Sequence, residues 1–153
     1  MAGPGDSKPV LRPGAVFRYA WLWHREYLAG QTEGRKERPA LALAVAISDQ
    51  DGRRHVLALP ITHVQPKAAH HRVELPAATK RILGLDDAPS WVITTEAARF
   101  AWPGADVRVA PGRATPIYGF VSSALLKSIA QSFLANRRLG ETVSFERYDR
   151  VVK

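Results

Sequence analysis

The sequence predicts a mainly β fold with a late helix, arranged as a small, strongly bent β-barrel on which that helix packs. First, its 153 residues are the length of one ordinary domain, with 46% hydrophobic and 24% charged residues. Second, roughly five to seven short apolar segments are separated by turn residues about every 8–12 positions. Third, a single long amphipathic segment lies near the end, without the strand–helix alternation typical of a doubly wound sheet.

The chain is expected to comprise a disordered leader at 1–12, the barrel domain at 13–140 and an extension at 141–153. Four of the first twelve residues are Gly or Pro, and Met1–Pro9 lacks the apolar stretch of a signal peptide. The longest apolar run, Pro39–Ile47, has nine residues, whereas a membrane-spanning helix needs about 20. We therefore expect no membrane segment.

The first half of the chain predicts a strand, a loop and a hairpin. Gly14–Trp21 is aromatic and β-branched, as a strand requires. His24–Arg38 is rich in charge and interrupted by glycines, which indicates a long, mobile and functional loop. The apolar strands Pro39–Ser48 and His55–Ile61 are joined by Asp-Gln-Asp-Gly, whose residues favour a tight turn.

The second half predicts short strands around two helices. Pro76–Leu83 is a short helix with proline at its first turn and Gly84 after its end. In Ser122–Arg138, an apolar stripe recurs at helical spacing: Leu126, Ile129, Ala130, Phe133 and Leu134. Thr142–Val152 is either an edge strand or a tail. The remaining short strands are expected at Arg72–Leu75, Ser90–Thr95, Val107–Val109 and Ile117–Phe120.

Charge and composition narrow the classes of function. Lysine and arginine outnumber acids by 22 to 14, giving a net charge of +8, which favours a polyanionic partner over a neutral one. Cysteine is absent, which excludes disulfides, thiolate metal sites and cysteine nucleophiles and fits a reducing cytoplasm. A merely soluble basic surface is the alternative interpretation.

Arg38 and Thr62 are the first candidates for chemistry. Arg38 precedes Pro39, which biases its backbone toward an extended conformation at the start of a buried strand. A guanidinium held there can bind a phosphate through two hydrogen bonds, or can simply pair with Glu37. Thr62 and His63 follow an apolar strand, which would place a hydroxyl and a proton carrier at the rim of the barrel. Taken alone, however, this pair is better explained by ordinary turn chemistry.

Other candidates are a carboxylate, cationic side chains, aromatics and histidines. Glu96 follows a predicted strand and could act as a base or orient Arg38, or be a solvated strand end. Arg35 and Lys36, with Trp23 and Trp102, are candidate RNA-binding residues, because aromatic rings stack on unpaired bases; Trp21 is expected in the core. His70 and His71 are adjacent, and neighbours on a strand point to opposite faces, so we expect no shared metal and no cofactor.

Several of these segments, taken in order over roughly residues 12–138, resemble the MazF/PemK family of toxins from bacterial toxin–antitoxin pairs. The opening strand at Gly14–Trp21, the Glu-Arg-Pro-Ala-Leu segment at 37–41 and the apolar strand ending in Pro-Ile-Thr at 60–62 carry the resemblance. It places the family's essential arginine on Arg38 and its essential threonine on Thr62. Glu96 stands where many members have aspartate, and His63 replaces a usually small polar residue.

The resemblance implies an SH3-like barrel, a homodimer and metal-independent cleavage of single-stranded RNA that leaves a 2′,3′-cyclic phosphate. It implies an acidic antitoxin protein as partner, and DNA binding only indirectly, through the antitoxin complex. The departures at Glu96 and His63 keep a second hypothesis open: a binding module for nucleic acid or protein without catalysis. A toxin directed at gyrase is a third.

Overall fold

The computed structural model describes residues 9–30 and 36–146 of the chain. Most of the expected leader, the candidate Arg35 and the extension from 147 onward lie outside the described residues. Leu11, which the sequence assigned to the leader, is buried against the domain at 5% exposure. The ordered domain therefore begins before residue 13.

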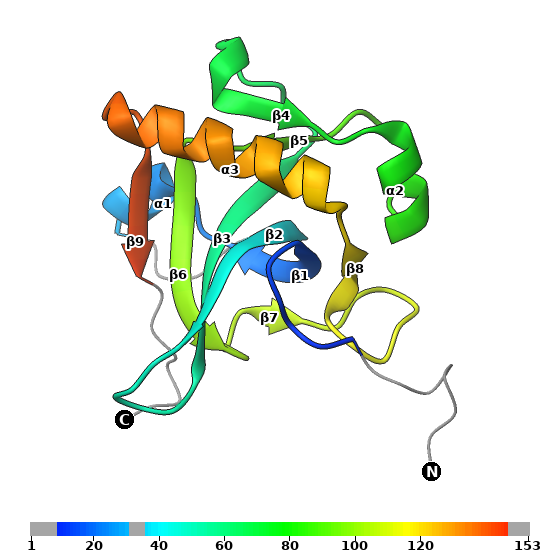
Figure 1. Cartoon of the computed structure of the whole chain (residues 1–153), viewed down its shortest axis with the longest axis vertical. Helices are drawn as coiled ribbons and strands as arrows, with labels where there is room; N and C mark the ends of the chain where they lie inside the picture. The colour runs from blue at the N-terminus through cyan, green and yellow to red at the C-terminus, as the bar shows by residue number, and fades with distance from the viewer. Residues whose placement is uncertain (1–8, 31–35, 147–153) are drawn as a thin grey trace.

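The described residues form a mainly β domain with a late helix, which confirms the predicted class (Figure 1). Its strands are β1 (Ala15–Trp21), β2 (Lys36–Ile47), β3 (Arg54–Thr62), β4 (Arg72–Glu74), β5 (Trp91–Ile93), β6 (Glu96–Trp102), β7 (Val107–Arg108), β8 (Ile117–Phe120) and β9 (Val143–Glu146). Its helical elements are α1 (His24–Leu28), the 3₁₀ turn η2 (Ala69–His71), α2 (Ala77–Leu83) and α3 (Ser123–Arg138). No helix of the described part is long and apolar enough to cross a bilayer.

The strands make one bent sheet, which is open in the described residues, where the sequence analysis expected a small, strongly bent barrel. Its main path runs β4-β5-β3-β2-β1-β7, while β6 adds to β3 and β8 adds to β1. Every pairing is antiparallel except that of β9, which lies parallel to β6 (Figure 1). Because β3 pairs first with β6 and then with β5, it turns the sheet sharply over its own length.

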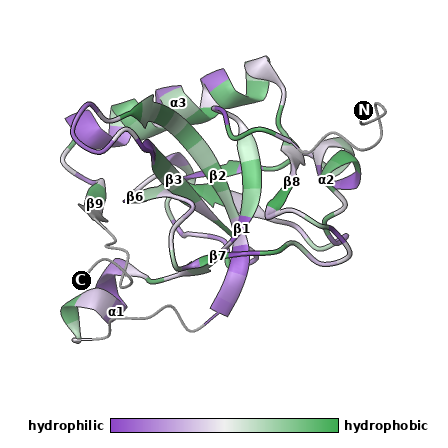
Figure 2. Cartoon of the chain, turned by 90° about the horizontal axis from the view of Figure 1, so that it is seen from below, coloured by the Kyte–Doolittle hydropathy of each residue, from purple (hydrophilic) through white to green (hydrophobic). Residues whose placement is uncertain are grey.

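Strand alternation separates two apolar clusters. Phe17, Tyr19 and Trp21 of β1 belong to an aromatic cluster on one face, whereas Val16 lies in the aliphatic cluster on the other. Ile129 and Phe133 of α3 pack on the aliphatic cluster, so the helix covers that face, as Figure 1 shows. In Figure 2 the start of β2, beside the grey segment, is hydrophilic, while the strands crossing the middle of the molecule are hydrophobic.

The segment His24–Arg38 is not a continuous loop, which corrects the sequence analysis. It contains α1, and β2 begins at Lys36, because the ladder between β1 and β2 continues to the pair Trp21 and Lys36. The start of α1 is held by a carboxylate: the backbone N of His24 donates to Glu96 Oε2 at 2.9 Å. Tertiary contacts therefore order the described parts of a stretch whose charge and glycines indicated a loop, while residues 31–35 lie outside the described residues.

The predicted strand Ser90–Thr95 is shorter than expected and is followed by a separate one. β5 ends at Ile93, and a bend at residues 94–95 leads into β6. The helix α2 matches its prediction, and Gly84 ends it with φ +72°, a left-handed conformation that favours glycine.

The predicted stripe of α3 is wrong at its C-terminal end. Leu134 is 45% exposed, while Asn136 is only 1% exposed. Asn136 Nδ2 donates to Thr94 Oγ1 at 2.9 Å and to the carbonyl of His70 at 2.8 Å. The bend between β5 and β6 and the turn η2 therefore offer polar partners to a helix position that periodicity did not assign to the buried face. The start of the helix follows its prediction, since Ser122 Oγ accepts from the backbone N of Leu125 at 3.1 Å.

Candidate functional site

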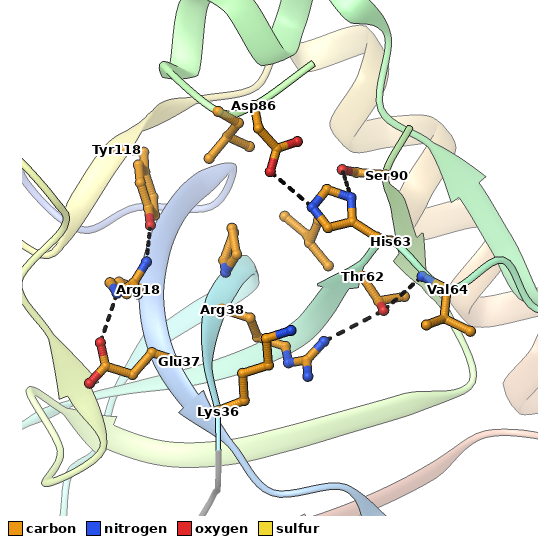
Figure 3. A pocket seen from close by; sticks show the side chains of 13 residues that line it. Arg18, Lys36, Glu37, Arg38, Thr62, His63, Val64, Asp86, Ser90 and Tyr118 are labelled. Atoms are coloured by element: carbon orange, nitrogen blue, oxygen red, sulfur yellow. Dashed lines mark hydrogen bonds and ion pairs between the residues drawn. The ribbon is translucent and has the colours of Figure 1, made fainter. Parts of the chain in front are cut away.

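A pocket of about 460 Å³ lies where β2 and β3 diverge at one end of the sheet (Figure 3). The strands β1, β2, β3 and β8 and the loop after α2 contribute its lining. Basic, acidic and hydroxyl side chains meet in it over an apolar floor. The lining residues are Arg18, Lys36, Glu37, Arg38, Pro39, Ile61, Thr62, His63, Val64, Leu85, Asp86, Ser90 and Tyr118.

The hairpin register brings Arg38 and Thr62 together. The last ladder pair of β2 and β3 is Ala40 opposite Pro60, so two residues further on Arg38 stands opposite Thr62. Arg38 Nη1 lies 3.5 Å from Thr62 Oγ1, at the limit of a hydrogen bond. The two residues that the sequence analysis ranked first therefore share one wall of the pocket (Figure 3).

Arg38 is a cation with few partners. Its Nε is buried and has no hydrogen-bond partner in the described part of the chain. The guanidinium also lies 5.1 Å from the ring of Trp23, a cation–π contact. Burial lowers the pKa of Arg38, Glu26 opposes this and Arg25 adds to it. The group stays charged at any physiological pH, so it is a charge that an anion would stabilise.

The expected alternative, a pair between Arg38 and Glu37, is not formed. Glu37 Oε1 instead accepts from Arg18 Nε at 2.8 Å, and Glu37 Oε2 lies 3.5 Å from Arg108 Nε. Arg18 also donates from Nη1 to the Tyr118 hydroxyl at 3.0 Å. The bond to Glu37, followed by that to Tyr118, raises the pKa of Arg18. The charge of Arg18 on this wall is therefore already paired with a carboxylate, unlike the charge of Arg38 on the wall that it shares with Thr62.

Thr62 is 7% exposed and keeps its hydroxyl hydrogen for a ligand. Its Oγ1 accepts from the backbone N of Val64 at 3.1 Å and from Arg38 at the longer distance. Both contacts use the oxygen as acceptor, so the O–H can donate to a third group. A phosphate oxygen placed between this hydroxyl and the guanidinium would receive hydrogen bonds from both.

His63 forms the opposite wall with a network of fixed polar groups. Its Nδ1 lies 2.8 Å from the carbonyl of Pro89 and its Nε2 lies 2.9 Å from Asp86 Oδ2. Both are acceptors, so the ring satisfies both only when each nitrogen carries a hydrogen. Burial alone would raise the pKa of Asp86, but hydrogen bonds from Lys80 and His63 outweigh it and the pKa is lowered.

A buried lysine anchors this network. Lys80 is 4% exposed, and its Nζ donates to Asp86 Oδ1 at 3.0 Å, to Ser90 Oγ at 2.7 Å and to the carbonyl of Ala88. Ser90 Oγ lies 3.1 Å from His63 Nδ1, so serine, histidine and aspartate stand in a row. Ser90 is 2% exposed and accepts from Lys80, which makes the row a support for the loop rather than an accessible nucleophile.

The structure does not bring Glu96 or Trp102 to this pocket. Glu96 Oε2 accepts from Trp21 Nε1 at 3.1 Å and from the backbone of His24, so the carboxylate holds α1 against β1. Trp102 packs edge-on against Phe17, with ring centroids 5.1 Å apart. Of the other candidate RNA-binding residues, Lys36 lines the pocket and Trp23 contacts Arg38.

Sequence reasoning did not single out Arg18, Asp86 or Tyr118 as pocket residues. Arg18 did carry a signal, because it is the one charged residue in the apolar segment Gly14–Trp21. A charge at an inward or semi-buried strand position requires a partner, which here is Glu37. Asp86 carried no such signal, since it lies in an acidic, solvent-accessible stretch typical of any loop.

Comparison with known proteins does not place the chain in a family. No protein-family model matches the sequence, and no curated protein matches it. The function therefore has to be argued from the pocket and its residues.

Proposed function

We propose that this chain is an RNA-cleaving toxin of the MazF/PemK kind and that the Arg38–Thr62 wall binds the phosphate to be cut. One observation carries the proposal: a half-buried guanidinium, whose buried Nε has no partner in the described residues, stands beside a hydroxyl with a free hydrogen, in a pocket open to solvent. Burying a charge without partners is costly, so the site is best satisfied when an anion occupies it.

In the proposed reaction, a ribose 2′-oxygen attacks the neighbouring phosphorus. A bond from phosphorus to O2′ forms while the bond to O5′ breaks, and the proton of the 2′-hydroxyl ends on O5′. Negative charge grows on the non-bridging oxygens, where Arg38 and Thr62 supply fixed donors. His63 is the candidate proton carrier of the lining, and this role requires its ring to release Asp86 or Pro89.

The pocket also suits the partners that the family resemblance implies. Lys36 extends the cationic wall beyond Arg38, and Trp23 offers a ring on which an unpaired base can stack. An acidic segment of an antitoxin would place a carboxylate on Arg38 and block the phosphate site. A homodimer would present two such pockets.

Cleavage of labelled single-stranded RNA in EDTA tests the proposal. We expect fragments with 2′,3′-cyclic phosphate and 5′-hydroxyl ends, and no cleavage of DNA or of 2′-O-methyl RNA of the same sequence, because both lack the nucleophile. Thr62→Val should slow cleavage about tenfold or more, while Thr62→Ser should retain most of it, since serine keeps the hydroxyl. Fragments with 3′-hydroxyl ends would refute the proposed chemistry.

A binding module without catalysis is the second candidate, and His63 and Glu96 favour it. Both ring nitrogens of His63 have acceptor partners, and Glu96 lies outside the pocket, where it bonds to the start of α1. The described lining therefore holds no acid–base pair that is free of other partners. This alternative predicts RNA binding whose log affinity falls linearly with log salt, without any cleavage product. The same RNA measured for binding and for cleavage separates the two.

A further inference from the structure

Two consecutive histidines converge on one carboxylate, away from the pocket. His70 Nε2 lies 2.8 Å and His71 Nε2 lies 2.6 Å from the same oxygen, Glu141 Oε2. The two imidazole rings are 4.3 Å apart at their centroids. The cluster is accessible, with side-chain exposures of 55%, 31% and 38% for His70, His71 and Glu141.

This arrangement overturns the expectation that the two histidines point to opposite faces. They lie in the 3₁₀ turn η2, not in a strand, and β4 begins only at Arg72. A 3₁₀ turn has about three residues per turn, so successive side chains diverge by roughly 120° rather than 180°. Both rings can therefore reach one acceptor.

The backbones that carry the three side chains are held by two buried residues, Asn136 and Thr94. The side chain of Asn136 donates from Nδ2 to the backbone carbonyl of His70 at 2.8 Å. The backbone carbonyl of Asn136 accepts from the backbone N of Glu141 at 2.9 Å. The carbonyl of His71 accepts from the backbone N of Thr94 at 3.0 Å. Because Asn136 is 1% exposed, the spacing between η2 and the turn after α3 is set by the core.

We propose that His70, His71 and Glu141 bind one divalent transition-metal ion of the Zn²⁺ class. Two imidazole nitrogens and one carboxylate oxygen are donors that Zn²⁺ prefers, and the donor atoms all lie within 4.8 Å of one another. Ligand bonds of about 2.0–2.2 Å place tetrahedral donors roughly 3.3 Å apart, so the donor atoms already lie within about 1.5 Å of the separations that the ion requires. Three protein ligands leave one position for water.

The existing contacts support the same assignment. Both histidines already direct Nε2 at one oxygen of the Glu141 carboxylate. A metal ion would replace two hydrogen bonds to one oxygen with three bonds to itself. It would also tie η2, between β3 and β4, to the turn that leads from α3 into β9. We infer a bracing role that does not depend on RNA cleavage.

The test uses the full chain without an affinity tag, stripped with EDTA and exchanged into metal-free buffer. Titration with Co²⁺, followed by visible absorption, should show one site per chain with the band intensity of a four-coordinate ion. Calorimetry with Zn²⁺ should give the same stoichiometry. Thermal unfolding should shift upward with added Zn²⁺, because a ligand that binds only the folded state stabilises it.

Variants decide whether these three residues form the site. His70→Ala, His71→Ala and Glu141→Gln should each weaken Zn²⁺ binding at least tenfold; the last keeps a hydrogen-bond acceptor for the histidines. His55→Ala is the matched control, because His55 lies 3.0 Å from Asp51 in an ordinary surface pair, and it should bind like the wild type. Unchanged binding in Glu141→Gln and His71→Ala, or no binding at millimolar Zn²⁺, would overturn the proposal in favour of a simple ion pair. RNA cleavage is not the readout, so either proposal can fail alone.

Discussion

The two arginines of the pocket lie on neighbouring strands, but the charge of one is paired with a carboxylate and the charge of the other is not. Arg18 on β1 is bonded to Glu37 and Tyr118, which raise its pKa. Arg38 on β2 has one long contact with Thr62 and a cation–π contact, and burial lowers its pKa. The difference teaches that a shared pocket does not mean a shared role: Arg18 supports the fold, and Arg38 is left for an anion.

Loss of Arg38 should have the largest effect. We expect Arg38→Gln to lower single-turnover RNA cleavage by about 100-fold or more, as removal of one transition-state donor does elsewhere. Arg18→Gln is the matched control in the same pocket, and we expect less than a tenfold loss from it. Circular dichroism checks that both variants fold. Equal losses would show that the pocket acts through its total charge and would break the comparison.

For stability we expect the reverse order, with a larger loss from replacing Arg18 than from replacing Arg38. This prediction holds whether or not the protein cleaves RNA. Arg18→Met removes an ion pair and a hydrogen bond, so we expect the free energy of unfolding in urea to fall by about 1 kcal/mol. Arg38→Met removes a half-buried charge with few partners and should leave this free energy unchanged or raise it. A clear loss of stability in Arg38→Met would mean that the folded chain already satisfies this guanidinium.

The carboxylate of Glu96 provides a third case, and we expect its replacement to change the free energy of unfolding by the smallest amount. Burial raises its pKa above the ordinary value of 4.5, although bonds from Trp21 and the backbone of His24 oppose the shift. The folded state then binds the proton more tightly than the unfolded state. Stability from this group is therefore present below pH 4.5 and is lost as the pH rises through the higher folded pKa.

Urea unfolding of the wild type and of Glu96→Gln between about pH 4 and 8 measures this term. Glutamine keeps an oxygen to accept both bonds, so we expect it to remove the pH-dependent loss with little other change. The variant should gain on the wild type, by less than about 1 kcal/mol, as the pH rises. A gain as the pH falls would show that the carboxylate is favoured in its charged form.

Local patterns were enough for most elements and for placing Arg38 and Thr62 at the ends of a predicted loop and strand. The turn at 49–52 and the apolar segments on either side of it predicted the hairpin, and Ser122 and Gly84 predicted a helix start and a helix end. Arg38 before proline and Thr62 after an apolar strand were predictable because both features are properties of adjacent residues. Charge pairing across strands was not, as the bond of Glu37 to Arg18 rather than Arg38 shows.

The sequence by itself predicted Arg38 directly before one strand of a hairpin and Thr62 directly after the other, but only the tertiary structure decided that the two side chains face each other. Near the turn, Ala44 pairs with Leu57, a register that, continued straight, would set Arg38 opposite His63. An irregularity between Ala42 and Ala44 shifts the pairing by one residue and sets Arg38 opposite Thr62. A shift of one residue also exchanges the two faces of a strand, and it depends on how the whole sheet bends, which no local pattern records.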